Sequence, residues 1–418
     1  MKKTLIAVAA AAALTTSAFA EITFGAWGRA ILVPIASNGD KTVAGQNQSW
    51  GGYGRAIGLD INGSDAEGKA GFSMSYRNTT EKPKAKWEGG DYDATNFLGD
   101  NAHFWIKPFD GLKVIAGKVE YNALRGNACL PGWDVIRSSF EVGEDLLFKN
   151  YAGTGALVEY TNDALTVFAA VPLTTAYSSK KNDKNNDEVS NVYKRTQAGA
   201  MYKIDGTGVV KAQFIGKNKE TTTVDDSKKM YTGDLEASFE LTAVENLWVG
   251  LGVTFPIMDK ELGGRLGDDN FKDFTGATDM KIGLGASYNV TDELTVMANG
   301  KVLLAQNYKK ENTGDESIKP GMQFAVGANY KIEDGFSFAA EVGYLAERKC
   351  GDEKINESSV FAMAGLNKSV GAANVFCGFE MQTNVKGQKN GLAGIKNPKA
   401  NTEKSTQWAI PVVISLSL

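Results

Sequence analysis

The sequence predicts an all-β protein: a single transmembrane antiparallel β-barrel of about eighteen strands, with short periplasmic turns and long extracellular loops. Three observations support this fold class. Apolar and other residues alternate with a period of two over long runs, short turns alternate with long polar loops, and the second face of most runs is rich in glycine and polar residues. We expect one barrel domain over residues 21–418, preceded by a signal peptide over residues 1–20.

The first twenty residues have the pattern of a secretory signal. Lys2 and Lys3 supply a positive start, residues 5–14 an apolar core, and Ala18-Phe19-Ala20 a cleavage site of small residues. The alternative, an N-terminal anchor helix, is disfavoured because the apolar core is much shorter than the roughly 20 residues that span a bilayer. We therefore expect an exported chain and leave these residues out of the fold.

Composition excludes several function classes. The net charge is −4, or −6 once Lys2 and Lys3 leave with the signal, so no basic surface for nucleic acid is expected. Forty-seven glycines, nine prolines and 43% hydrophobic residues fit neither a disordered nor a collagen-like chain. No later segment is long and apolar enough for a membrane helix, whereas a barrel strand turns only alternate residues toward lipid.

Alternation is clearest in the run 407–418. One face carries Trp408, Ile410, Val412, Ile414, Leu416 and Leu418, and the other carries Gln407, Ala409, Pro411, Val413, Ser415 and Ser417. Similar runs cover 247–256, 279–290 and 321–332, a length that suits a tilted membrane crossing. A sandwich or propeller would fill its buried face with large side chains, so the small and polar second face favours a wide barrel.

Turn signals divide the chain into strands. The expected ranges are 22–33, 53–62, 69–77, 101–107, 112–120, 153–161, 165–173, 195–204, 208–217, 231–241, 247–256, 279–290, 294–304, 321–332, 336–346, 358–367, 372–382 and 405–417. Sixteen stays an alternative count, because 101–107 alternates least convincingly. Either even number puts both ends of the barrel on one side of the membrane.

A tyrosine precedes four of the short turns. Tyr160, Tyr202, Tyr288 and Tyr330 each stand three or four residues before an Asp or Glu of the turn. In a barrel they would belong to the aromatic girdle at the periplasmic interface with outer-membrane lipid. The alternative is that they flank the turns of soluble hairpins.

The signal, the strand that opens at Glu21-Ile-Thr-Phe-Gly-Ala-Trp-Gly-Arg29 and the amphipathic final run together resemble bacterial outer-membrane porins. The opening resembles most the porin-like outer-membrane proteins of treponemes, which are spirochaetes. The resemblance implies location in the outer membrane, passage of small hydrophilic solutes, and the barrel-assembly machinery as a partner. Porins commonly end in an aromatic residue that this machinery reads, and the present chain departs from that pattern with Leu418.

Few residues could carry chemistry, and we expect neither an enzyme nor a cofactor nor a metal site. The single histidine, His103, has no serine motif beside it for a nucleophilic pair. The three cysteines include no C-x-x-C pattern. Cys129 and Cys350 fall in expected loops on the same side of the membrane, and whether they form a disulfide stays open; Cys377 falls in a strand.

The third long loop, 121–152, is unusually apolar. It carries Leu124, Leu130, Pro131, Trp133, Val135, Ile136, Phe140, Val142, Leu146, Leu147 and Phe148, whereas loops in water are mostly polar. In general porins the third loop folds into the barrel and narrows the pore, so the resemblance implies a constriction here. Its charged residues Arg125, Asp134, Arg137, Glu141, Glu144 and Asp145 would then set the field. The alternative is a lid packed among the neighbouring extracellular loops.

Charged residues of the strands should face the lumen, because in lipid each would cost several kcal/mol near the midplane. This set comprises Arg29, Lys113, Glu159, Lys211, Asp234, Glu236, Glu240, Lys281, Lys301, Lys331, Glu341 and Glu380. Opposed charges across a lumen would select solutes by charge and dipole. For any single residue, the alternative is that its charge only keeps the lumen hydrated and selects no solute.

These features predict a porin-like channel for passive diffusion of small hydrophilic solutes. Alternation begins directly after the expected cleavage site, so we expect no N-terminal plug of the kind that energy-coupled receptors and fatty-acid transporters carry. One alternative is a surface barrel that acts mainly as an adhesin or structural protein. A hydrophobic-solute transporter and an exported soluble β protein also stay open, as does assembly into a homo-oligomer.

Overall fold

The computed structural model describes residues 21–37, 42–46, 55–78, 98–126, 130–132, 151–173, 196–221, 229–258, 279–305, 319–350, 353–384 and 406–418. Over these ranges the chain is almost entirely β-strand, with one short 3-10 turn η1 at Glu333–Gly335. The described residues contain no helix of the length and hydrophobicity that a membrane crossing needs. Residues 1–20, the expected signal peptide, lie outside the described part.

The strands in chain order are β1 (Glu21–Ser37), β2 (Thr42–Gln46), β3 (Arg55–Ser64), β4 (Ala70–Asn78), β5 (Leu98–Phe109), β6 (Leu112–Tyr121), β7 (Tyr151–Thr161), β8 (Leu165–Pro172), β9 (Gln197–Ile204), β10 (Gly208–Thr221), β11 (Lys229–Leu241), β12 (Leu247–Met258), β13 (Asp279–Asn289), β14 (Leu294–Ala305), β15 (Gly321–Lys331), β16 (Phe336–Leu345), β17 (Arg348–Cys350), β18 (Glu353–Asn356), β19 (Ser359–Val370), β20 (Ala373–Thr383) and β21 (Thr406–Ser417). Short turns join them at one end of the barrel, the turn end, and longer segments at the other, the loop end.

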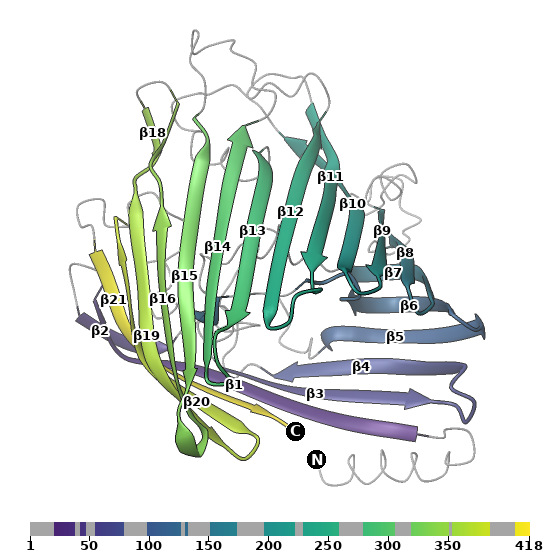
Figure 1. Cartoon of the computed structure of the whole chain (residues 1–418). Helices are drawn as coiled ribbons and strands as arrows, with labels where there is room; N and C mark the ends of the chain where they lie inside the picture. The colour runs from purple at the N-terminus through teal and green to yellow at the C-terminus, as the bar shows by residue number, and fades with distance from the viewer. Residues whose placement is uncertain are drawn as a thin grey trace, which may run out of the picture.

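The main sheet closes on itself. Each strand pairs antiparallel with its neighbour in the chain, and β21 pairs back with β1 from Trp27↔Ser417 to Ser37↔Trp408. Of the nineteen strands in this sheet, β2 pairs only with β1, from Leu32 to Ser37, and continues the ladder that β3 forms with the earlier part of β1. Eighteen strands therefore form the ring. The predicted closed barrel of eighteen strands is confirmed, and the least convincing expected strand, 101–107, is the centre of β5. Figure 1 shows β3 to β6 running steeply across the direction of β12 to β15, as tilted strands on different walls of a barrel do.

Three short strands depart from the expected pattern. β2 pairs with β1 beyond Leu32, and the register shifts around Pro34, which has no N–H to donate to a ladder. β17 and β18 form a separate two-stranded hairpin that stands beyond the loop ends of β16 and β19 (Figure 1). All three were expected as loop, because none has an alternating apolar pattern long enough to recognise.

The two faces of the barrel separate as the alternation predicts. Leu251, Leu284 and Phe324 point outward and are about half exposed, at 50, 52 and 56%. Along β21, Gln407, Ala409, Pro411 and Val413 are buried on the inner face, while the residues between them are more exposed. The outer surface is therefore apolar around the barrel, which suits contact with hydrocarbon.

Two sectors of the inner wall are apolar, in contrast to the small and polar inner face that the sequence suggested. One, the near cluster, joins Ile115, Val119, Tyr121, Leu157, Phe168 and Ala170 of β6 to β8 with Leu124. The other, the far cluster, joins Ile31, Val33, Ala36, Ala325, Ala339, Phe361, Met363, Phe376, Ala409 and Val413 of β1, β15, β16 and β19 to β21 with Leu130. Apolar side chains can line the inside of a barrel where protein covers them, and each cluster includes one leucine from the segment after β6.

Candidate functional site

The segment after β6 turns inward and packs on the wall formed by β8 to β10. Leu124 is 3% exposed within the near cluster. A Cβ built on Gly199 of β9 would lie 2.8 Å from Leu124 Cδ2, so a glycine is needed to seat this leucine. On β10, Lys211 Nζ donates a hydrogen bond to the Arg125 carbonyl oxygen at 3.4 Å.

A few residues later the same segment contacts β15 and β16. Leu130 is 2% exposed within the far cluster. The Gly132 N–H donates to Glu341 Oε2 at 2.8 Å, and both groups are buried. A Cβ on Gly327 of β15 would lie 2.6 Å from Pro131 Cδ. The absence of a side chain at Gly327 therefore leaves room for the proline, as the absence of one at Gly199 leaves room for Leu124.

These two contact regions lie on different walls of the barrel. In the ring of eighteen strands, β8 to β10 are five to eight strand positions from β15 and β16. With strands about 4.8 Å apart and tilted by about 40°, the ring is roughly 35 Å across. The eleven steps from Tyr121 to Gly132 can extend over a similar distance, about 36 Å. Residues 121–126 and 130–132, which we call the strap, therefore contact two separate walls of the interior.

The charged strap residue Arg125 is described, whereas Asp134, Arg137, Glu141, Glu144 and Asp145 lie outside the described residues. The expected role of these six side chains in a constriction stays a prediction.

Buried polar side chains link β9 to β12 on the inner wall near the strap. Lys211 forms an ion pair with Glu240, whose other oxygen accepts a hydrogen bond from Trp248 Nε1 at 3.3 Å. Gln213 donates to Glu236 Oε2 at 2.5 Å. Such pairing lets charged groups remain inside the barrel without the full cost of desolvation.

The expected lumen charges fall into three groups. Nearly fully buried are Lys211, Asp234, Glu236, Glu240, Glu341 and Glu380. Partly buried on the inner face are Arg29, Lys113, Glu159, Lys281 and Lys301. Lys331 is exposed at the turn end, where its ammonium donates to the Asp292 carbonyl oxygen at 3.0 Å. A role in lining a pore stays a prediction for each of them.

A buried ion pair at the loop end was missed by the sequence reading. Arg348 of β17 binds Asp279 of β13 through two hydrogen bonds of 2.7 and 2.8 Å. Its Nε also donates to the Lys319 carbonyl oxygen at 2.9 Å, so one side chain ties the hairpin to the rims of β13 and β15. No sequence pattern predicts this contact, because Arg348 stands in an expected loop and its partner is 69 residues away.

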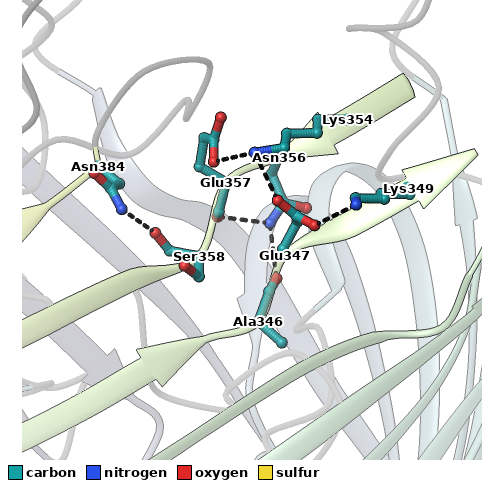
Figure 2. A network of polar contacts seen from close by, with 8 residues as sticks. All are labelled: Ala346, Glu347, Lys349, Lys354, Asn356, Glu357, Ser358 and Asn384. Atoms are coloured by element: carbon teal, nitrogen blue, oxygen red, sulfur yellow. Dashed lines mark hydrogen bonds and ion pairs between the residues drawn. The ribbon is translucent and has the colours of Figure 1, made fainter. Parts of the chain in front are cut away.

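The same hairpin carries an exposed charged network (Figure 2). Glu347 pairs with Lys349 at 3.0 Å and with Lys354 at 2.8 Å, and Lys354 also pairs with Glu357 at 2.9 Å. Hydrogen bonds from Lys354 and Lys349 lower the pKa of Glu347, and those to Glu347 and Glu357 raise the pKa of Lys354. Asn356 Nδ2 closes the base of the hairpin by donating to the Ala346 carbonyl oxygen at 2.9 Å.

A basic and aromatic cluster lies on the inner face near the turn end. The ammonium groups of Lys107 and Lys113 lie 5.3 and 5.2 Å from the ring centre of Trp105. His103 lies two residues before Trp105 on the same face of β5, and its Nδ1 is 3.1 Å from the Lys118 carbonyl oxygen. Of this cluster, only Lys113 was expected at the lumen; Trp105 and Lys107 were missed although they share its face.

The remaining expected residues occupy the outer face or give no site. Tyr160, Tyr202, Tyr288 and Tyr330 are exposed near the turn end, where a girdle would lie, and that role stays a prediction. Cys377 is free and exposed on β20. Cys129 lies outside the described residues, so whether it pairs with Cys350 stays open. The described residues hold no group of three or more potential metal ligands.

The sequence finds no match among family models, and none among curated proteins. Among solved structures, the chain is similar to the anion-selective porin of Comamonas acidovorans, with a TM-score of 0.50 and 10% identity over 95% of this chain and 100% of that one. It is also similar to the outer-membrane channel DcaP of Acinetobacter baumannii, with a TM-score of 0.47 and 14% identity over 95% and 97% of the two chains. OmpT of Vibrio cholerae matches with a TM-score of 0.45 and 12% or 13% identity.

The first of these likenesses shows that the chain has the fold of bacterial outer-membrane porins. The general resemblance expected from the signal, the opening strand and the final run is thereby confirmed at the level of fold. The finer likeness to treponemal proteins stays a prediction from the opening of the chain.

Proposed function

We propose that this protein is exported through a cleavable signal and forms a porin-like channel in the outer membrane. Small hydrophilic solutes would diffuse through it passively, and the loop 121–152 would narrow the path. The observation that carries the proposal is the strap, whose two ends contact separate walls of a closed eighteen-strand barrel. The similarity in fold to a porin named anion-selective supports a channel, and we extend only the channel function to this chain.

The strap would act as a constriction because its contacts lie inside the barrel and not at its rim. Leu124 and Leu130 contact inner-face residues of the two apolar clusters, and Glu341 holds the backbone at Gly132. Solutes must then pass beside the strap, where the free cross-section is smaller than that of an empty barrel. The narrowest part of a channel dominates its electrical resistance, so displacing the strap should raise conductance.

Single-channel recording in planar bilayers tests the proposal with the variant Gly327→Val. Its Cβ would lie 2.6 Å from Pro131 Cδ and 3.1 Å from the Ala340 carbonyl oxygen, so the strap must leave this seat. We expect discrete current steps from the unaltered protein and larger steps from the variant. Deleting residues 133–148 should raise conductance further.

Gly300→Val is the matched control, since Gly300 lies on the neighbouring strand β14 and a Cβ there meets nothing closer than 3.6 Å. It should conduct like the unaltered protein. A folded barrel without current steps would contradict the channel and favour the alternative of a surface adhesin or structural protein. Equal conductance in all variants would agree with the channel but contradict the proposed constriction.

A further inference from the structure

Two lysines converge on one tryptophan inside the turn end of the barrel. Lys107 and Trp105 lie on the inner face of β5, and Lys113 lies on the inner face of β6. Their ammonium nitrogens lie 5.3 and 5.2 Å from the Trp105 ring centre. A Cβ on Gly71 would lie 2.5 Å from Trp105 Cζ2, so the indole rests against the backbone of β4 where a larger residue would push it away.

This arrangement places like charges beside each other on neighbouring strands. Trp105 pairs with Ile115 and Ile106 with Val114, so Lys107 and Lys113 follow at the same level, where the register shifts. Like charges opposed across two strands destabilise a sheet. Among the described residues, no carboxylate lies within ion-pair distance of either ammonium group.

One acidic group is near enough to offset part of this charge. Glu159 of β7 is the register partner of Lys113 and attracts it electrostatically. The three side chains still carry a net charge of +1 in ionised form. Lys113 is partly buried, whereas Lys107 is exposed. A cationic group in a partly buried place gains free energy when an anion approaches it, because the local dielectric constant is lower than in bulk water.

We propose that Trp105, Lys107 and Lys113 form a binding site in the channel for small organic anions with a flat apolar body, such as aryl carboxylates. The carboxylate would bind between the two ammonium groups through charge-assisted hydrogen bonds. The ring would lie against the exposed part of the indole, where offset or edge contacts between aromatic rings are favourable. The inference rests on the proposed channel and adds a preferred solute class to it.

Benzoate is the probe for this site. We expect benzoate added on the turn side to reduce the single-channel current in a concentration-dependent manner. Acetate, with the charge but no ring, and benzyl alcohol, with the ring but no charge, should be much weaker. The double variant Lys107→Met/Lys113→Met should weaken benzoate block by about tenfold or more, as expected for losing a charge-assisted contact. Trp105→Leu should reduce benzoate to the level of acetate.

The matched control is Lys203→Met/Lys368→Met, which removes two lysines from the turn ends of β9 and β19, away from Trp105. This control should change benzoate block by no more than about twofold. Equal losses in both double variants, or equal block by acetate and benzoate, would overturn the site.

Equilibrium dialysis of labelled benzoate against the folded protein in detergent measures the same site without conduction. A conducting channel that does not bind benzoate would refute the site and leave the proposed function standing. Saturable, lysine-dependent binding by a barrel without current steps would refute the channel and leave the site.

Discussion

The outer face of β12 gives a direct test of how the barrel sits in a bilayer. Leu251 is 50% exposed and pairs with Phe239 and Leu284 on the neighbouring strands. It lies four residues from the turn end of its strand at Leu247. At about 3.4 Å per residue and a tilt near 40°, its height is about 10 Å. An apolar band of about 25 Å puts this position close to the midplane.

Leu251→Arg should therefore lower the free energy of unfolding by roughly 2–4 kcal/mol, the cost of an arginine near the midplane of a barrel's lipid face. Equilibrium unfolding of the barrel in phosphocholine vesicles by guanidinium chloride measures this difference. Leu251→Ala is the control for the loss of the leucine itself. Val244→Arg is the control for depth, because Val244 is an exposed residue of the short turn before β12 and should cost only about 0–1 kcal/mol. A cost for Leu251→Arg no greater than that for Val244→Arg would refute the assignment of this face to lipid.

Two further predictions concern the hairpin at the loop end. Arg348→Met leaves a buried carboxylate without its cation and should destabilise the fold by about 3–5 kcal/mol; adding Asp279→Leu should restore much of this in the same unfolding assay, and no recovery would contradict a paired role. For the exposed network, the lowered pKa of Glu347 means that its contribution is present above the ordinary value of 4.5 and is lost as pH falls through the lowered value. The raised pKa of Lys354 means that its contribution is present below 10.5 and is lost as pH rises through the raised value. Amide hydrogen exchange of β17 and β18, corrected for intrinsic rates, should show most protection between these limits, and protection independent of pH would contradict the network.

The ring strands could be predicted because the outward and inward faces of each strand differ in polarity. Outward residues such as Leu284 are apolar and inward ones such as Lys281 are often polar, so the residues of each strand alternate with a period of two. The ends of strands were less predictable. β10 continues to Thr221, beyond the expected end at 217, because hydrogen bonding between strands can continue past the apolar band, where hydropathy no longer alternates. β2 and the hairpin β17–β18 were missed for the same reason.

For the candidate site, the sequence predicted only whether a residue faces the inside of the barrel. Alternation placed Glu341 and Lys211 inside the barrel, and composition marked the third loop as one that would pack on protein. The sequence could not predict which strands each strap residue contacts. Gly132 and Glu341 are 209 residues apart, and their contact depends on the closed ring. The far cluster was unexpected because its side chains come from strands at both ends of the chain.

The pairing of β1 with β21 has a consequence for assembly. This seam joins the first described strand to the last, so it can form only when all other strands have a place in the ring. Loss of the twelve residues of β21 would leave two unpaired edges, one on β1 and one on β20. Each unpaired backbone group in hydrocarbon costs several kcal/mol. In hydrocarbon, the completed cylinder and the incomplete sheet would thus be separated by a large free-energy gap, and an unfinished chain would need its edges covered until the seam forms.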